Sequence, residues 1–190
     1  MAHHEGVTYQ PVEDAGAAAW FGGADVDVWT KIACGPPGYD EYVRVFFVNE
    51  TERPDVAEPA MPAVVDILAA HTTTSEECFV ALWEGNGGTT PPGPEFDIFD
   101  DLLGSVRRYV LLSAPAGRLF DVGTFEPGEE LWPEPHAVWP ADRAWFIAAD
   151  VDPEWCTVGT THKAAAALLA DPRLDTELVP YGERLTESGR

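Results

Sequence analysis

Four short apolar runs constrain the fold of this 190-residue chain more than any other feature of its sequence. Each run is rich in β-branched and aromatic residues, which is typical of buried β-strands. They are YVRVFFV (42–48), CFVALWEG (78–85), RRYVLLSAP (107–115) and AWFIAADV (144–151). None approaches the ~18 consecutive apolar residues that a membrane-spanning helix needs. The runs therefore predict a core built around a β-sheet.

Three other segments predict helices. DAGAAAWF (14–21) begins with Asp14, a favourable N-cap residue. AMPAVVDILAAH (60–71) has apolar residues at helical spacing. TTHKAAAALLADP (160–172) combines a threonine cap, an alanine-leucine interior and an Asp-Pro stop. A fourth segment, FDIFDDLLG (96–104), is predicted to be a short helix or a turn.

The order of these elements predicts an α+β fold with a mostly antiparallel sheet and two or three helices. Strands and helices do not alternate strictly, which favours helices packed on one face of the sheet. TELVPYG (176–182) is predicted to be a last edge strand, because Pro180 has no N–H donor. We expect a loosely held N-terminal segment (1–13), one α+β domain (14–182) and a flexible tail (183–190).

The net charge of −22 is the strongest global property of the chain, with 33 acidic residues against 11 basic ones. A field of this sign repels phosphate groups, so the sequence predicts no binding to nucleic acid or to an anionic membrane surface. Basic partners are attracted instead. The acidic residues are scattered, and three interpretations stay open: solubility or adaptation to salt, a face for a basic protein, and a cation site.

The cysteine pattern and the N-terminal sequence predict a cytoplasmic protein. Cys34, Cys78 and Cys156 lie far apart, form no CxxC motif and are odd in number. This pattern favours thiols in a reducing compartment. The first ten residues, MAHHEGVTYQ, do not have the basic and apolar regions of a signal peptide.

The spacing of possible metal ligands gives only weak evidence for a metal site in this chain. A zinc site needs closely spaced cysteines or histidines, and three of the histidines are isolated from one another: His71, His136 and His162. Two pairs of aspartates alternate at predicted strand ends and offer two carboxylates each to a divalent ion. They are Asp25 with Asp27 and Asp150 with Asp152. Such pairs arise by chance in an acid-rich chain, so the prediction is no metal and no cofactor.

No catalytic motif is present in the sequence. It contains no GxSxG, GxGxxG or P-loop pattern. Adjacent carboxylates such as Glu76 and Glu77 do not have the opposed geometry that a hydrolase needs. The loop NGGTTPPGPE (86–95) is either a flexible border of a site or a simple connection. The sequence therefore leans away from an enzyme and predicts no catalytic residue.

The segment WPADRAW (139–145) has the greatest potential for a binding site. Interpreted as a structural corner, Pro140 forces an extended entry, Asp142 accepts backbone N–H bonds and Arg143 stacks on a neighbouring tryptophan, Trp139 or Trp145. Interpreted as a site, its aromatic and charged side chains line a small-molecule pocket. The candidate ligand-binding residues are Trp83, Glu84, Trp139, Asp142, Arg143, Asp150 and Asp152.

Three stretches of the chain resemble a group of uncharacterised proteins from high-GC bacteria. The stretches are GYDEYVRVFF, HTTTSEECFVALWEGNG and LWP…WPADRAWFIAADVD…TVGTTHKAAAALLADPRL, and together they span roughly residues 38 to 175. The matching positions are Trp83, Glu84, Gly85, Trp139, Pro140, Asp142, Arg143, Trp145 and Asp152. The resemblance implies a soluble intracellular protein and assigns no activity and no catalytic residue. The chain departs from the group at TVGTT (157–161), where a second glycine is lost.

The leading hypothesis from the sequence is a non-enzymatic protein-binding module with a basic partner. Size, acidity and the order of elements are similar in character to the immunity proteins of bacterial toxin systems, so an immunity-type or regulatory role is its specific form. The alternative is a small-molecule-binding protein or an enzyme with a pocket at Trp83, Trp139, Arg143, Asp150 and Asp152. A divalent-cation site at Asp150 and Asp152 is the third hypothesis.

Overall fold

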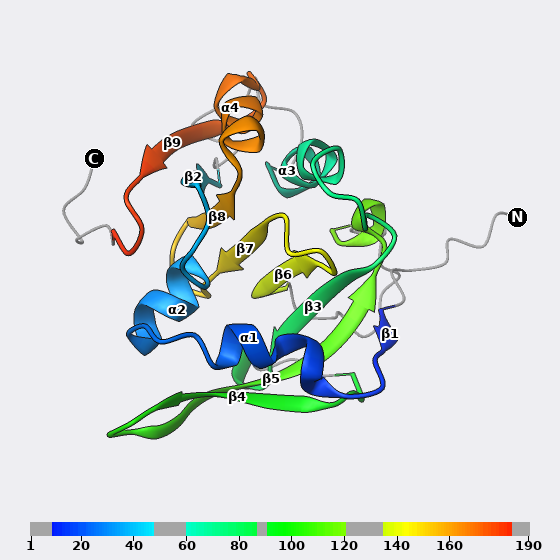
Figure 1. Ribbon diagram of the computed structural model, residues 1–190, viewed down its shortest axis with the longest axis vertical. Coiled ribbons are helices and arrows are strands. Elements are labelled where there is room, and N and C mark those ends of the chain that lie inside the picture. Colours follow the sequence, from blue (N-terminus) through cyan, green and yellow to red (C-terminus); the bar gives the residue numbers. More distant parts are fainter. Residues whose placement is uncertain (1–8, 48–59, 87–90, 121–134, 184–190) are drawn as a thin grey trace, which may run out of the picture.

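The computed structural model describes residues 9–47, 60–86, 91–120 and 135–183, and these residues form one antiparallel sheet flanked by helices (Figure 1). The strands are β1 (Gln10–Pro11), β2 (Glu41–Phe46), β3 (Cys78–Trp83), β4 (Glu95–Asp100), β5 (Gly104–Ala114), β6 (Ala137–Pro140), β7 (Phe146–Ala149), β8 (Trp155–Thr160) and β9 (Asp175–Val179). Their order in the sheet is β1-β5-β3-β6-β7-β8-β2-β9, and β4 also pairs with β5. The predicted α+β class is confirmed.

The described residues contain four α-helices, one more than the two or three expected. They are α1 (Ala19–Gly22), α2 (Val28–Cys34), α3 (Ala60–Ala69) and α4 (His162–Ala170). Three single turns of 3-10 helix accompany them: η1 (Ala15–Ala18), η2 (Glu84–Asn86) and η3 (Ala116–Arg118). The predicted caps form, because Asp14 accepts from the N–H of Gly16 and Thr161 accepts from the N–H of Ala164.

Helix α2 was missed by the sequence reasoning, which placed Asp25 and Asp27 at the end of a strand. Asp27 is instead the N-cap of α2, and its side chain accepts from the N–H of Thr30. The helix buries Val28, Ile32 and Cys34 against the sheet. Its seven residues are too few for helical periodicity to stand out from the sequence alone.

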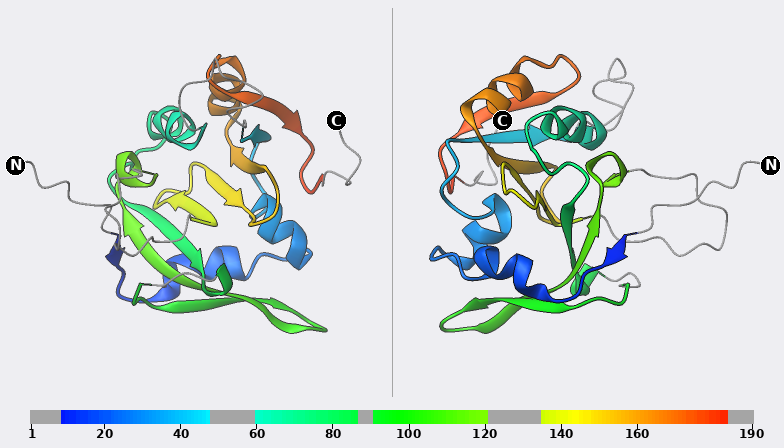
Figure 2. Two further views of the ribbon diagram at one scale, coloured as in Figure 1. Left: turned by 180° about the vertical axis from the view of Figure 1, so that it is seen from behind. Right: turned by 45° about the vertical axis from the view of Figure 1, so that its right-hand side comes forward.

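The expectation that all helices pack on one face of the sheet is wrong. Helices α3 and α4 contribute to one apolar cluster and α1 and α2 to another, and Figures 1 and 2 show the two pairs apart from each other. Neighbouring residues of one strand enter different clusters: Val80 and Leu82 face α3 and α4, whereas Ala81 faces α1 and α2. Because strands such as β3 are apolar on both faces, each face needs its own cover.

The segment 96–104 was predicted to be a short helix or a turn, and this holds only for residues 101–103, which form the turn of a hairpin. Residues 95–100 form strand β4, which pairs with β5 in an antiparallel hairpin whose register shifts between Ile98 and Phe99. Ile98 is fully buried and Phe96 stacks on Tyr109 of β5, with ring centroids 5.4 Å apart. This alternation of inward-facing residues is the period of a strand.

Strands β6 and β8 were not predicted. The first and last strands of the chain, β1 and β9, also differ from expectation in their presence or their bounds. β6 is four residues long and β8 is six, and together they flank β7 in the centre of the sheet. β9 is an edge strand, as predicted, but it ends at Val179, before Pro180, and does not extend to residue 182. Gln10 and Pro11 of the N-terminal segment belong to the sheet, because they pair with β5. Tyr9, just before them, donates to the carbonyl of Leu119 at 2.9 Å.

Candidate functional site

The segment 139–145 is the corner between β6 and β7. Trp139 is fully buried in β6 and stacks on Phe146 of β7, with ring centroids 5.5 Å apart and planes 11° apart. Arg143 is exposed and lies 4.7 Å from the ring of Trp20, the residue before Phe21 in α1. The predicted stacking of Arg143 on Trp139 or Trp145 is therefore wrong. Its backbone takes a positive φ of 56°, which a tight corner requires.

Asp142 is a structural clamp at this corner. Its carboxylate accepts four hydrogen bonds, from Thr72 Oγ1 at 2.7 Å, Thr73 N at 2.7 Å, Thr73 Oγ1 at 2.8 Å and Ala144 N at 3.1 Å. Burial opposes ionisation, but these donors outweigh it and lower the pKa of Asp142 to about 2. The clamp ties the corner to the loop between α3 and β3.

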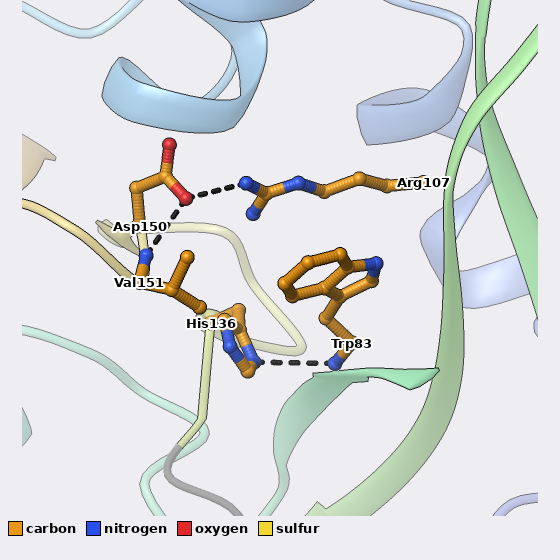
Figure 3. A network of polar contacts seen from close by, with 5 residues as sticks. All are labelled: Trp83, Arg107, His136, Asp150 and Val151. Atoms are coloured by element: carbon orange, nitrogen blue, oxygen red, sulfur yellow. Dashed lines mark hydrogen bonds and ion pairs between the residues drawn. The ribbon is translucent and has the colours of Figure 1, made fainter. Parts of the chain in front are cut away.

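A second polar cluster joins Trp83 and Asp150 through a residue that the sequence reasoning did not select (Figure 3). Arg107 of β5 is only 8% exposed, and its Nη2 donates to Asp150 Oδ1 at 2.5 Å. Its guanidinium lies 4.4 Å from the centre of the Trp83 ring. The signal for Arg107 was the alternation of the strand. Arg107, Tyr109 and Leu111 are at positions i, i+2 and i+4, so all three face the same side of β5.

His136 completes this cluster, and its chemistry is that of a neutral hydrogen-bond acceptor. Its Nδ1 accepts from the backbone N–H of Trp83 at 3.1 Å, so the remaining ring proton is on Nε2. Burial, together with the nearby charge of Arg107, lowers the pKa of His136 to about 4. The ring nitrogen that lacks a proton is already occupied by Trp83, so His136 is poorly arranged to act as a base.

The predicted pocket residues fall into two groups rather than one. Trp139 lies opposite Phe79 on β3, and Trp83 is four residues further along the same strand, which corresponds to roughly 13 Å. Trp139, Asp142 and Arg143 therefore belong to the corner, whereas Trp83 and Asp150 belong to the Arg107 cluster. The last two candidates, Glu84 and Asp152, are exposed.

The described residues contain no group of three His, Cys, Asp or Glu side chains placed to hold a metal ion. Asp150 is engaged with Arg107 and also accepts from the N–H of Val151 at 2.7 Å. Asp27, as described above, caps α2. These roles account for one member of each aspartate pair without a cation.

All three cysteines are buried. Burial raises the pKa of the Cys78 and Cys156 thiols to about 12 each, so both stay protonated at neutral pH. A protonated, buried thiol is a poor nucleophile. In the part of the chain that the structure describes, no helix is long and apolar enough to cross a membrane.

The tip of the β4–β5 hairpin, residues 99–103, is the most exposed apolar feature of the described residues. Leu102 is 94% exposed, Leu103 is 67% exposed and Phe99 is 61% exposed. The hairpin projects past α1 and α2 at the lower edge of Figure 1. Sequence reasoning missed this feature because it assigned 96–104 to a helix or a turn and did not predict two paired strands that extend into solvent. Clustered exposed apolar residues mark interaction sites more often than single ones do.

The charges are distributed unevenly between the interior and the surface. Every Asp and Glu among the described residues is at least partly exposed. In contrast, three of the eight described basic side chains are buried: Lys31, Arg44 and Arg107. Arg44, for example, is fully buried against Trp155 and donates to Glu177 Oε1 at 2.9 Å. The described surface is therefore more negative than the composition indicates.

Comparisons of the chain with protein-family models, with curated proteins and with solved structures returned no match. The resemblance to proteins of high-GC bacteria therefore stays a prediction.

Proposed function

We propose that this protein is a non-enzymatic binding module for a basic protein. The observation that carries the proposal is the sorting of charge: described carboxylates are at the surface, and three of the eight described cations are buried. A buried Lys or Arg cannot meet the charges of a partner, so the surface offers mainly negative charge. Such a surface steers basic proteins toward it and repels nucleic acid and acidic proteins.

The buried cations make their contacts within the chain. Lys31 donates to the carbonyl of Gly22 at 2.8 Å, and Arg44 donates to Glu177 and to the carbonyl of Glu183. These contacts join separate parts of the chain and give the buried cations structural roles. An immunity-type or regulatory role, in which the module covers a basic surface of another protein, is the specific form of the proposal.

Affinity purification from a lysate of the encoding organism, at low ionic strength, tests the proposal. Any protein retained is identified, purified and titrated against the module by calorimetry at low and high salt. We expect a 1:1 complex with a basic protein, and its affinity should fall as salt screens the charges. If no purified protein forms a stoichiometric complex at low ionic strength, the proposal is wrong.

A small-molecule site has one specific observation in its favour. Nη1 of Arg107 is buried and has no hydrogen-bond partner among the described residues. The carboxylate or carbonyl oxygen of a ligand would supply the acceptor that this group lacks. The side chain also lies against Trp83, an aromatic wall of the kind that small-molecule sites use.

A thermal-shift screen with small carboxylic acids, nucleotides and divalent metals tests this second candidate. A ligand at ~100 times its Kd adds ~2.7 kcal/mol to the stability of the folded state. The shift should be lost in Trp83→Leu, which removes the wall over Arg107, and kept in Asp152→Ala, which changes an exposed carboxylate. A screen in which no compound raises the Tm argues against the small-molecule site.

A further inference from the structure

We infer that the hairpin tip (99–103) is an anchor that inserts into an apolar pocket, rimmed by Lys and Arg, on the partner protein. The inference rests on the proposed function and deepens it by naming the contact surface and the chemistry of its partner. Phe99, Leu102 and Leu103 are each more than half exposed. A few large apolar side chains at the centre of an interface usually supply most of the binding energy.

The tip is held in one shape before any partner binds. Oδ1 of Asp100 accepts from the N–H of Leu102 at 2.9 Å and from the N–H of Leu103 at 3.0 Å. Gly104 follows with a φ of +77°, which completes the reversal of the chain. The two leucines are therefore fixed at the end of the hairpin, so a partner loses less affinity to the ordering of a loop.

The hairpin is also firmly rooted in the fold. Below the tip, Ile98 is fully buried, and Phe96 packs edge-on against Phe21 of α1, with ring centroids 6.1 Å apart. Ser105 donates to Asp97 Oδ1 at 2.6 Å, which joins the two strands. Exposure of the tip is thus not the result of a poorly packed segment: the same hairpin buries its inward-facing residues and presents its end to solvent.

Charge selects the class of occupant. Asp100 and Asp101 lie between the apolar side chains of the tip, and Asp101 is exposed. Two tips meeting in a dimer would bring four carboxylates together, which disfavours a second copy of this chain as the occupant. The same carboxylates oppose insertion into an anionic bilayer. A protein pocket with an apolar floor and a basic rim satisfies both the leucines and the aspartates.

The experiment combines site-specific cross-linking with matched substitutions. A photoreactive benzoylphenylalanine replaces Leu102 in the full chain, and the control carries it at Leu178, a half-exposed leucine of the edge strand β9. Cross-linked proteins are identified, purified and titrated against the parent chain. Affinities are then measured for the Leu102→Ser/Leu103→Ser double variant, for Asp101→Lys and for Leu178→Ser. Circular dichroism and the Tm of each variant verify that it is folded.

The expected result is a partner that cross-links at 102 and not at 178 and binds the double variant about 30-fold or more weakly. Asp101→Lys should weaken binding and reduce its salt dependence, and Leu178→Ser should leave the Kd unchanged. A partner that binds the folded double variant with the parental Kd overturns the anchor and leaves the proposed function intact. Cross-linking of the chain to itself, with a dimer in sedimentation, also overturns it. The absence of any stoichiometric partner rejects the proposed function and the anchor together.

Discussion

Replacing Asp142 by alanine tests whether the corner at 139–145 is a structural clamp. The substitution removes an acceptor for four donors, from Thr72, Thr73 and Ala144, at 2.7–3.1 Å. Because the carboxylate is exposed, water replaces part of what is lost, and each bond contributes near the lower end of its range, about 0.5 kcal/mol. We expect Asp142→Ala to lower the free energy of unfolding by about 2 kcal/mol, which corresponds to about 4–8 °C in Tm.

The effect should depend on pH in a defined direction. The pKa of Asp142 is lowered from its ordinary value of 3.8 to about 2 in the folded state. A carboxylate with a depressed pKa contributes stability that is fully present above pH 3.8 and is lost as the pH falls through 2. Urea unfolding of the parent and of Asp142→Asn at about pH 7, 4 and 3 measures this. The difference in their free energies of unfolding should be nearly constant between about pH 7 and 4 and should begin to shrink at about pH 3.

Asp152→Ala is the matched control, because it removes an exposed aspartate from the loop after β7. It should change stability by no more than about 0.5 kcal/mol. The reasoning is refuted if Asp142→Ala is as stable as this control at neutral pH. It is also refuted if the gap between the parent and Asp142→Asn grows as the solution becomes more acidic.

Three further predictions follow from buried groups. Trp139→Ala should cost about 3–5 kcal/mol in urea unfolding, because the side chain is fully buried, whereas Trp29→Ala at a half-exposed indole should cost less than about 1 kcal/mol. The pKa of His136 is lowered from 6.5 to about 4, so its unfolded form gains a proton first as the pH falls. The chain should therefore lose about 3 kcal/mol between pH 6.5 and 4, and His136→Asn should lose less. Gly159→Ala would place a Cβ 2.5 Å from Cδ2 of Tyr39. We expect this substitution to lower the free energy of unfolding by about 1–3 kcal/mol, which a lower Tm than that of the parent would show.

The elements that the sequence predicted well are those whose signal is local. The run at 107–115 became β5 and the helix at 160–172 became α4, because β-branched residues, a threonine cap and an Asp-Pro stop act over a few residues. The segment 96–104 failed for a related reason. Its apolar residues fit a strand or a short helix equally well, and only pairing with β5 decides between them.

In the candidate site, too, local features could be predicted and contacts between distant residues could not. Trp83 and Asp150 were selected from local composition, and they do lie in one cluster. Arg107, which contacts both, comes from β5, and His136 comes from the residue just before β6. Trp139 and Asp142 were selected for the same reasons and take structural roles at the corner instead. Local composition identifies which side chains are capable of chemistry, and it does not say which of them meet.

The sequence by itself determined the class of the fold, the negative charge and the residues that a core can be made from. Each of these follows from composition or from spacing within a few residues. The tertiary structure decided that helices cover both faces of the sheet, that Arg107 is enclosed between Trp83 and Asp150, and that Leu102 and Leu103 project into solvent. These outcomes depend on contacts between residues far apart in the chain, and such contacts form only when the strands pair in a particular order and register.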